Sequence, residues 1–452
     1  MRTRATFPCP WVPAALLGLL PALARADEAQ LTGYDALGRA GRAVRLLAKL
    51  ETAGMLGVHP DVEEEPLDFF LVRANGKELE RPKFLGTGET DDDGVATVEW
   101  TPPGPGRFAI EARVRKGSQY VALPAEIVVL VPRKERAVIL VQVDRTLSTA
   151  TNLQMFRGVE NEKIPAVEGA VETLGVLSQH YDLVYLTDLE RAFTEKFKEW
   201  LALRKAPPAP TLFWDLFERS LSHATYMKKL VAKLHREQPQ VALGIGGHPS
   251  DGEAFVASGL VGIVVGKDLD DLPLEVVPAH RWPQVVAHVA GAYAASRQLV
   301  SLAGGSPAER SAALEALTGN GRPGIGYVHR FRRSTDPNLA AAAHLVIGKI
   351  QACDAFLSAL RRRSANDALH SLLAAWRYGE RAVVARLYDD PESGRRDPMP
   401  RFERCELVSR HEPEPAKVVF RLALFRGEER SERSLVFVRG EDKLWRVHAE
   451  DF

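Results

Sequence analysis

The stretch Ala137-Val-Ile-Leu-Val-Gln-Val-Asp-Arg-Thr-Leu-Ser148 decides the fold in the middle of the chain. Its apolar run is broken only by Gln142 and ends at Asp144, Arg145 and Thr146. Hydrophobicity that is continuous, rather than alternating, predicts a strand buried on both faces of a parallel sheet. Because open α/β sheets place their ligand sites beyond the carboxyl ends of strands, the polar residues after this strand are the first candidates for a site.

Strands and helices then alternate along the chain to about residue 302. Short apolar segments predict further strands at residues 183–186, 211–214, 241–245 and 261–265. Between them, apolar residues at helical spacing predict single helices, the first opening at residue 164, and a longer helix is expected at 283–302. Such alternation is typical of a doubly wound, Rossmann-like α/β domain with a parallel sheet.

The regions on either side of this domain have different patterns. Residues 27–132 contain short strands separated by turns rich in Asp, Pro and Gly, which predicts an all-β, Ig-like sandwich. Residues 303–337 are rich in Gly, Ser, Pro and Arg and predict a flexible linker, followed by a helix to residue 363. Residues 364–452 combine a helix with four strand-like stretches. They loosely resemble the α+β cone of the nuclear-transport-factor (cystatin-like) superfamily, a fold that fixes no function.

The amino terminus predicts export. A charged start is followed by an apolar segment at residues 11–23 and by Ala24-Arg-Ala26, a small-x-small site before Asp27. These are the parts of a secretory signal peptide, so residues 1–26 are expected to be removed and the mature protein to be periplasmic or secreted. The expected domains are therefore a β-sandwich at 27–132, an α/β domain at 133–302, a linker and helix at 303–363, and an α+β cone at 364–452.

The amino-acid composition limits the kinds of partner and the covalent links that the chain is expected to have. Lys plus Arg and Asp plus Glu both number 59, so no overall charge favours nucleic acid. The cluster of Arg330, Arg332 and Arg333 could meet anionic phosphates or a membrane surface, and a solvated loop is the ordinary alternative. After signal cleavage only Cys353 and Cys405 remain, either as one disulfide or as two buried thiols.

Polar residues of the α/β domain follow a familiar order. They are Gln142, Asp144 and Thr146, then Thr187, then Lys228 or Lys229, then Asp251 in Gly-His-Pro-Ser-Asp. This order resembles the motifs of the haloacid-dehalogenase-like superfamily of phosphohydrolases. The resemblance implies acid/base chemistry at Asp144, phosphate binding by Thr146, Thr187 and a lysine, and Mg²⁺ bound by Asp144 and Asp251. A divalent cation and a lysine would offset the repulsion between an anionic nucleophile and a phosphate.

The nucleophile position of that superfamily is changed in this chain. Where the superfamily has Asp, the chain has Gln142, whose carboxamide can neither form an acyl phosphate nor give magnesium an anionic oxygen. Over about residues 137–268 the finer resemblance is to lipin-type phosphatidate phosphatases and to the carboxyl-terminal domain of membrane-associated phosphatidylinositol-transfer proteins. The latter domain lacks the nucleophile and is associated with phosphatidic acid.

These features favour a catalytically degenerate domain that binds a phosphate ligand, such as phosphatidic acid or another anionic phospholipid, with peripheral membrane contact. Two alternatives stay open: an active Mg²⁺-dependent phosphatase, and an interaction scaffold with a vestigial site. Each residue also has a structural reading, with Thr187 and Asp251 as helix caps and Lys228 and Lys229 as surface residues. Their conjunction in the expected order is what predicts a site.

Overall fold

The structure is a computed structural model, in which two compact units divide between Val129 and Leu130. The predicted signal peptide lies outside the described residues. Among the helices that are described, none is both long and apolar enough to cross a membrane. The described residues are 27–52, 60–149, 159–214, 222–267, 269, 271–359, 364–378, 381–390, 394, 399–400, 402, 404–426 and 428–448.

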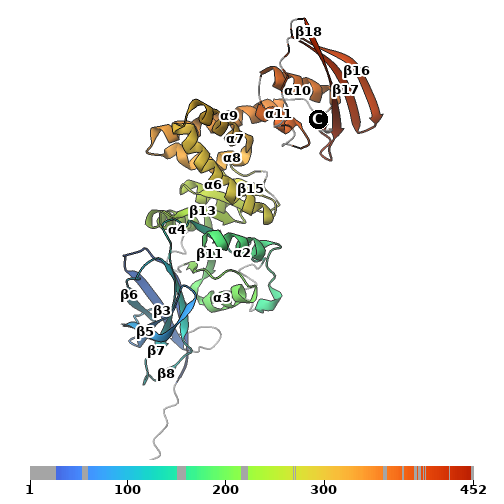
Figure 1. The fold of residues 1–452 in the computed structure, drawn as a ribbon. Helices are drawn as coiled ribbons and strands as arrows, with labels where there is room; N and C mark the ends of the chain where they lie inside the picture. Colours follow the sequence, from blue (N-terminus) through green and yellow to red (C-terminus); the bar gives the residue numbers. More distant parts are fainter. Residues whose placement is uncertain are drawn as a thin grey trace, which may run out of the picture. The chain divides into compact units, whose positions relative to one another are not determined.

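The first unit is built from two β-sheets, in the orders β6-β3-β1-β8 and β2-β9-β7-β4-β5 (Figure 1). Strand β3 alternates buried and less buried residues, and its inward side chains include Leu46 and Leu50, which are fully buried with Phe69 of β4. This confirms the sheet-rich amino-terminal region that the sequence predicts. The strands are β1 (Asp27–Tyr34), β2 (Ala36–Leu37), β3 (Val44–Thr52), β4 (Pro66–Ala74), β5 (Lys77–Glu89), β6 (Val95–Trp100), β7 (Gly106–Val114), β8 (Tyr120–Val121) and β9 (Ala125–Val131).

A six-stranded parallel sheet, in the order β12-β11-β10-β13-β14-β15, begins the second unit. Every residue of β10 is buried, as the continuous apolar run predicts. The strand order runs outward from β10 in both directions, so β10 is a topological switch point, where α/β sheets open a crevice. The strands are β10 (Val138–Gln142), β11 (Asp182–Glu190), β12 (Thr211–Trp214), β13 (Val241–Gly246), β14 (Val261–Val265) and β15 (Val277–Ala279).

The helices of this domain follow the predicted alternation, with one shift. The first was expected from residue 164 but begins at Ala170, after Gly169, whose φ of 73° is left-handed. Ile164 is instead fixed in a loop, because Trp200 Nε1 and Arg204 Nε donate hydrogen bonds to its carbonyl at 2.8 and 3.0 Å. The helices are α2 (Ala170–His180), α3 (Thr194–Leu203), α4 (His223–Glu237), α5 (Pro249–Ala257) and α6 (Pro283–Gly304), with short 3₁₀ turns η2 (Asn161–Lys163) and η3 (Arg191–Phe193).

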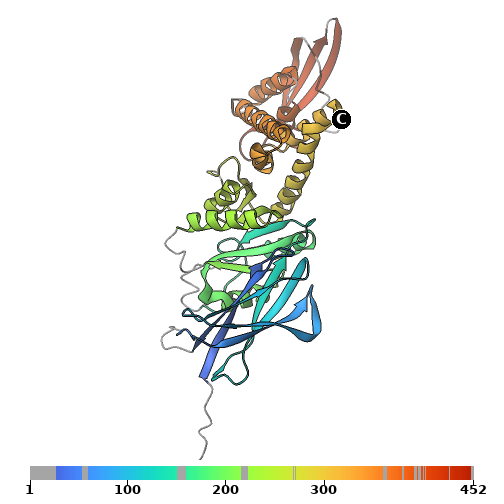
Figure 2. The same ribbon diagram turned by 90° about the vertical axis from the view of Figure 1, so that its left-hand side faces the viewer.

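The prediction of a flexible linker at 303–337 is wrong, because this segment is helical. Ser306 and Glu309 form a reciprocal capping box at the start of a helix, and Leu317, Ile325 and Val328 are buried in the same core as α6. Figure 2 shows this part of the chain as helices. The elements are α7 (Pro307–Gly319), α8 (Arg322–Val328), η5 (His329–Arg333) and α9 (Pro337–Ala359).

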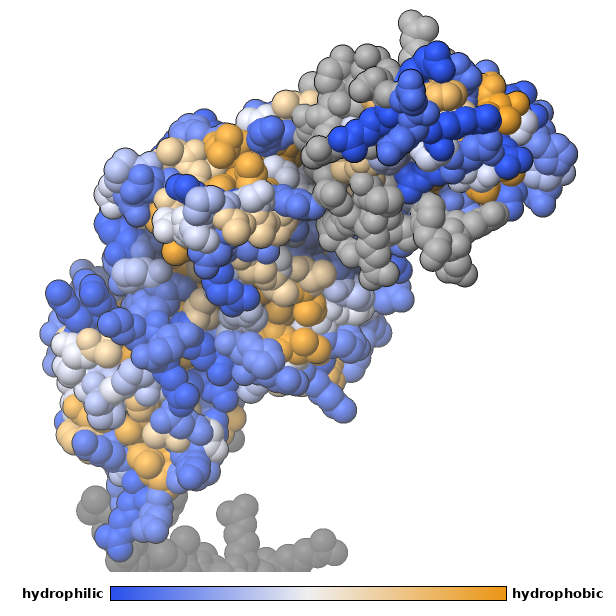
Figure 3. All heavy atoms as spheres, turned by 45° about the horizontal axis from the view of Figure 1, so that its top comes forward, coloured by the Kyte–Doolittle hydropathy of each residue, from blue (hydrophilic) through white to orange (hydrophobic). Residues whose placement is uncertain are grey.

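The carboxyl-terminal region packs helices on an antiparallel sheet in the order β16-β17-β18-β19. Its core includes Leu372, Trp376, Phe420 and Phe437. Cys405 carries a free thiol, and the side chain of Cys353 lies outside the described part. The elements are α10 (Ala365–Tyr378), α11 (Arg381–Leu387), β16 (Arg404–Glu414), β17 (Lys417–Arg426), β18 (Glu429–Arg439) and β19 (Trp445–His448). The face shown in Figure 3 is mostly hydrophilic, with scattered hydrophobic groups.

Candidate functional site

A cavity of about 310 Å³ lies where β10, β11 and β13 end. The amino-terminal ends of α4 and α5 complete its wall, so that strand ends and helix starts meet at one place. This is the position at which a doubly wound sheet is expected to bind a ligand. The lining residues are Gln142, Asp144, Arg145, Asp188, Ser222, His223, Ala224, His248, Ser250 and Asp251.

The loop after β10 is held in an unusual conformation. Arg145 has a φ of 59°, in the left-handed region that costs an L-residue about 1–2 kcal/mol. Gly247, after β13, approaches so closely that a Cβ atom there would lie 2.5 Å from the Arg145 carbonyl oxygen. On the other side, Trp282 Nε1 donates to the Thr146 carbonyl at 3.1 Å. The loop is therefore fixed by neighbours, and Arg145 is left exposed at the cavity.

Asp144 is at the centre of the polar network. Its Oδ2 accepts hydrogen bonds from Gln142 Nε2 at 3.1 Å, Thr187 Oγ1 at 2.7 Å and the Asp188 backbone N–H at 2.8 Å. The Thr187 hydroxyl, predicted to bind phosphate, thus binds a carboxyl group of the same chain. A phosphate group can use these two β11 donors only when Asp144 turns away from them.

The neighbouring carboxyl groups of Asp144 and Asp188 have pKa values that are shifted in opposite directions. Burial, together with the negative charge of Asp188, raises the pKa of Asp144 well above its usual range. Burial also acts to raise the pKa of Asp188, but hydrogen bonds with His223 and Asp144 outweigh it and lower that pKa. Near neutral pH, Asp144 therefore holds a proton and Asp188 is ionised.

His223, the first residue of α4, lies between two carboxylates. Its Nε2 is 2.9 Å from Asp251 Oδ1, and its Nδ1 is 3.5 Å from Asp188 Oδ2. Hydrogen bonds with Asp188 and Asp251 raise the pKa of His223 to about 9, against the effect of burial. The other oxygen of Asp251 accepts from the backbone N–H groups of Gly247 and His248. His223 is thus an imidazolium that neutralises the two acids.

These side chains do not fit magnesium well. Mg²⁺ prefers near-octahedral oxygen ligands. Here a cationic imidazole already binds Asp251, and Gln142 supplies a neutral oxygen in place of a carboxylate. In the parts of the chain that the structure describes, no group of three His, Cys, Asp or Glu side chains is arranged to bind a metal ion.

The structure brings together most of the residues predicted for the site, but not the lysines. Gln142, Asp144 and Asp251 line the cavity, and Thr187 binds Asp144, while Thr146 is buried in the loop beside it. Lys228 and Lys229 are exposed and lie away from the cavity, with Lys228 Nζ 4.0 Å from Glu253. His223, Asp188, Ser222 and Ser250 were missed.

Trp282 gives a direct test of how the loop is held. Trp282→Phe keeps an aromatic ring at a position only 1% exposed but leaves the Thr146 carbonyl without its donor, which is expected to cost about 1–3 kcal/mol. Amide hydrogen exchange of residues 144–148 should become faster. The control Trp200→Phe loses an indole hydrogen bond to the Ile164 carbonyl, which keeps its bonds from Arg204, and should leave exchange at 144–148 unchanged. Equal acceleration in both variants would contradict this role.

Comparisons with known proteins give partial likenesses. No protein-family model matches the chain, and no curated protein matches it. Among solved structures, a haloacid dehalogenase-like family hydrolase from Streptococcus pneumoniae is 12% identical, covering 35% of this chain and 100% of its own, with a TM-score of 0.26. A PKD domain of human KIAA0319 is 12% identical over 26% of this chain and 94% of its own, with a TM-score of 0.17.

The D0-D1 domains of intimin are 20% identical, with a TM-score of 0.16, over 23% of this chain and 46% of theirs. The chain thus spans about half the length of that intimin structure. At these scores the likenesses carry no functional argument. What defines the site is its own geometry: an α/β domain with a polar cavity at the switch point of a parallel sheet.

Proposed function

We propose that the α/β domain is a degenerate phosphatase-type domain that binds a phosphate-bearing ligand without hydrolysing it. The observation that carries this proposal is Gln142, a carboxamide only 1% exposed at the end of β10, where a phosphoryl-accepting carboxylate would be needed. The next carboxyl group, Asp144, is protonated near neutral pH and hydrogen-bonded to β11, so it is a poor replacement nucleophile.

Binding of an anion is supported by the charges around the cavity. Two helices, α4 and α5, begin there, and the positive ends of their dipoles attract negative charge. At α5 the capping box already binds the backbone N–H groups, so this helix contributes its dipole rather than free donors. Arg145 and the His223 imidazolium offset the carboxylates of Asp188 and Asp251. A phosphate group can therefore enter near Arg145 without meeting a net negative field.

Unpaired buried atoms suggest what else the ligand carries. Gln142 Oε1 and Asp188 Oδ1 are buried and have no hydrogen-bond partner among the residues that the structure describes. Both are acceptors, and a ligand hydroxyl or a water molecule beside the phosphate would satisfy them. A phosphate ester with a polar headgroup fits this pattern, and phosphatidic acid or another anionic phospholipid at a membrane surface is our specific proposal. The signal peptide that the sequence predicts at residues 1–26 adds the proposal that this ligand is met in the periplasm or outside the cell.

The test measures binding and turnover of the mature chain together. We expect the protein to float with phosphatidylcholine vesicles that contain phosphatidic acid, and to release no phosphate from dioctanoyl phosphatidic acid with Mg²⁺. Arg145→Ala should weaken vesicle binding about tenfold, as expected for a charge-assisted contact. The matched control, Lys228→Ala, removes an equal charge outside the cavity and should bind normally.

Other results would select the alternatives. Mg²⁺-dependent phosphate release that is lost in Asp144→Asn would show an active phosphatase and refute the proposal. Absence of vesicle binding, with an intact fold, would favour a scaffold with a vestigial site. One observation supports the scaffold alternative: the Thr187 hydroxyl and the Asp188 N–H on β11 already donate hydrogen bonds to Asp144.

A further inference from the structure

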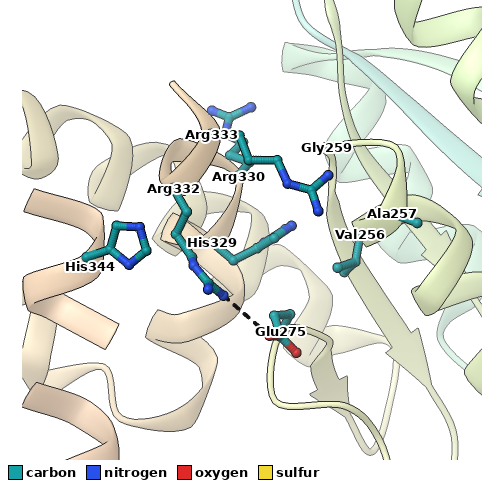
Figure 4. Close-up of a pocket in the computed structure, with 9 residues that line it drawn as sticks. All are labelled: Val256, Ala257, Gly259, Glu275, His329, Arg330, Arg332, Arg333 and His344. Carbon is teal, nitrogen blue, oxygen red and sulfur yellow. Dashed lines mark ion pairs between the residues drawn. The ribbon is translucent and has the colours of Figure 1, made fainter. Parts of the chain in front are cut away.

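A second cavity, of about 340 Å³, lies at the opposite end of α5 from the candidate site (Figure 4). One wall is formed by Val256, Ala257 and Gly259, where α5 ends. The other is formed by η5 and by α9, so the cavity belongs to the helical segment that follows the sheet. None of the residues that line it lines the candidate site at the strand ends.

Arg330 is the most unusual residue of this cavity. Its Nη2 donates to Ser296 Oγ at 3.1 Å and its guanidinium lies 4.7 Å from the centre of the Phe331 ring, but Nε is buried without a hydrogen-bond partner. No carboxylate of the described chain forms an ion pair with it; burial lowers its pKa, yet a guanidinium stays charged. A half-buried cation of this kind is stabilised when an anion joins it.

His329 lies beside Arg330 on the same wall. The residue is 9% exposed, and its Nδ1 lies 3.0 Å from the Gly326 carbonyl oxygen. Its imidazole is directed toward Val256 in Figure 4; burial lowers its pKa, and interactions with the Gly326 and Val256 backbones act against that effect. The unpaired polar atom on which an anion site depends is therefore Arg330 Nε.

The remaining charges make the cavity cationic. Arg332 and Arg333 are exposed at its mouth, and Arg332 Nη1 is 3.8 Å from Glu275. Among the described residues that line the cavity, Glu275 is the one acid, against three arginines. Three guanidinium groups argue against a metal ion, although two histidines are present. Guanidinium groups instead recognise oxyanions such as phosphate through paired N–H donors.

We infer that this cavity is a second anion site, which binds a small phosphate-bearing molecule with Arg330 as its half-buried anchor and with Arg332 and Arg333 at its mouth. The volume is that of a small-ligand pocket rather than of a flat docking surface. The apolar wall at Val256 and Ala257 would contact the organic part of the ligand. A soluble phosphate ester and a lipid headgroup share this chemistry, and the experiment separates them.

The experiment is a calorimetric titration of the mature chain with pyrophosphate and with glycerol 3-phosphate. It is done in the Arg145→Ala background, so that binding at the candidate site at the strand ends is weakened and the variants below report on the second cavity. We expect saturable 1:1 binding that the exposed double variant Arg332→Ala/Arg333→Ala weakens at least tenfold and that Arg330→Gln abolishes. The control, Arg310→Ala, removes an exposed arginine of α7 and should bind as the background does.

Failure of this inference can be distinguished from failure of the proposed function. Unchanged affinity in the double variant, or an equal loss in Arg310→Ala, would overturn the inference, and so would an absence of binding to both phosphates and to phosphatidic acid vesicles. The double variant keeps the test valid if Arg330→Gln fails to fold. Binding of phosphatidic acid vesicles that depends on Arg332 and Arg333, without binding of glycerol 3-phosphate, would assign the site to a lipid headgroup. Binding of glycerol 3-phosphate in solution would assign it to a soluble ester.

Discussion

His223→Ala is expected to lower the free energy of unfolding by about 3 kcal/mol at pH 6. Folding raises the pKa of this imidazole from 6.5 to about 9, and a tenfold change in proton affinity corresponds to about 1.4 kcal/mol. Because the folded-state pKa is the higher one, the stabilisation is fully present below pH 6.5 and is lost as the pH rises through about 9. The difference between the native chain and the variant should therefore shrink across this range.

The measurement is urea unfolding of the mature chain from pH 6 to pH 10, with a chelator present so that no metal ion competes for Asp188 or Asp251. His223→Gln separates charge from packing, because it keeps a polar side chain but cannot become a cation. His280→Ala, at an exposed position of the same domain, should change stability by less than about 0.5 kcal/mol. A His223→Ala effect that is the same at pH 6 and pH 10 would show that the imidazolium does not neutralise the two acids.

The central sheet could be predicted from sequence because a buried parallel strand leaves a continuous apolar run. β10 is the clearest case, and β13 and β14 follow the same rule. β15 could not be predicted, because a three-residue strand carries too little pattern. The composition of residues 303–337 led to the wrong prediction of a flexible linker. A local signal for a helix was nevertheless present, because Ser306-Pro-Ala-Glu309 is a capping box.

The candidate site could be predicted where its residues follow strands and at Asp251, in the first turn of α5. Asp144 and Thr187 follow apolar runs, so their place in space follows from the sheet. Lys228 and Lys229 do not line the cavity. The reason is that α4 buries Tyr226, Met227, Val231 and Leu234, which turns residues 228 and 229 toward solvent. His223 is four residues before Met227, so helical spacing could have identified it as the inward residue. Its pairing with Asp251 depends on packing between α4 and α5, which no local pattern shows.

Gln142→Asp is expected to destabilise the fold by about 3–5 kcal/mol at pH 7 and to produce no phosphatase. The amide donates to Asp144 Oδ2 at 3.1 Å, at a position 1% exposed, so the substitution replaces a hydrogen-bond donor with a second buried acid. Burial raises the pKa of the new carboxyl in the folded state. Its penalty is therefore absent below about pH 4, the unfolded value, and grows by about 1.4 kcal/mol for each pH unit above it.

Gln142→Asn is the matched control, because asparagine and aspartate have the same shape and differ in charge. The asparagine variant should show a smaller loss that does not depend on pH between 4 and 7, while the aspartate variant becomes steadily less stable over that range. Turnover of dioctanoyl phosphatidic acid should stay at the level of the asparagine control, because a nucleophile alone does not supply a phosphate site. The Thr187 hydroxyl and the Asp188 N–H still bind Asp144, and neither lysine reaches the cavity. Turnover above that control would show that the missing carboxylate is the one thing that keeps this domain from catalysis.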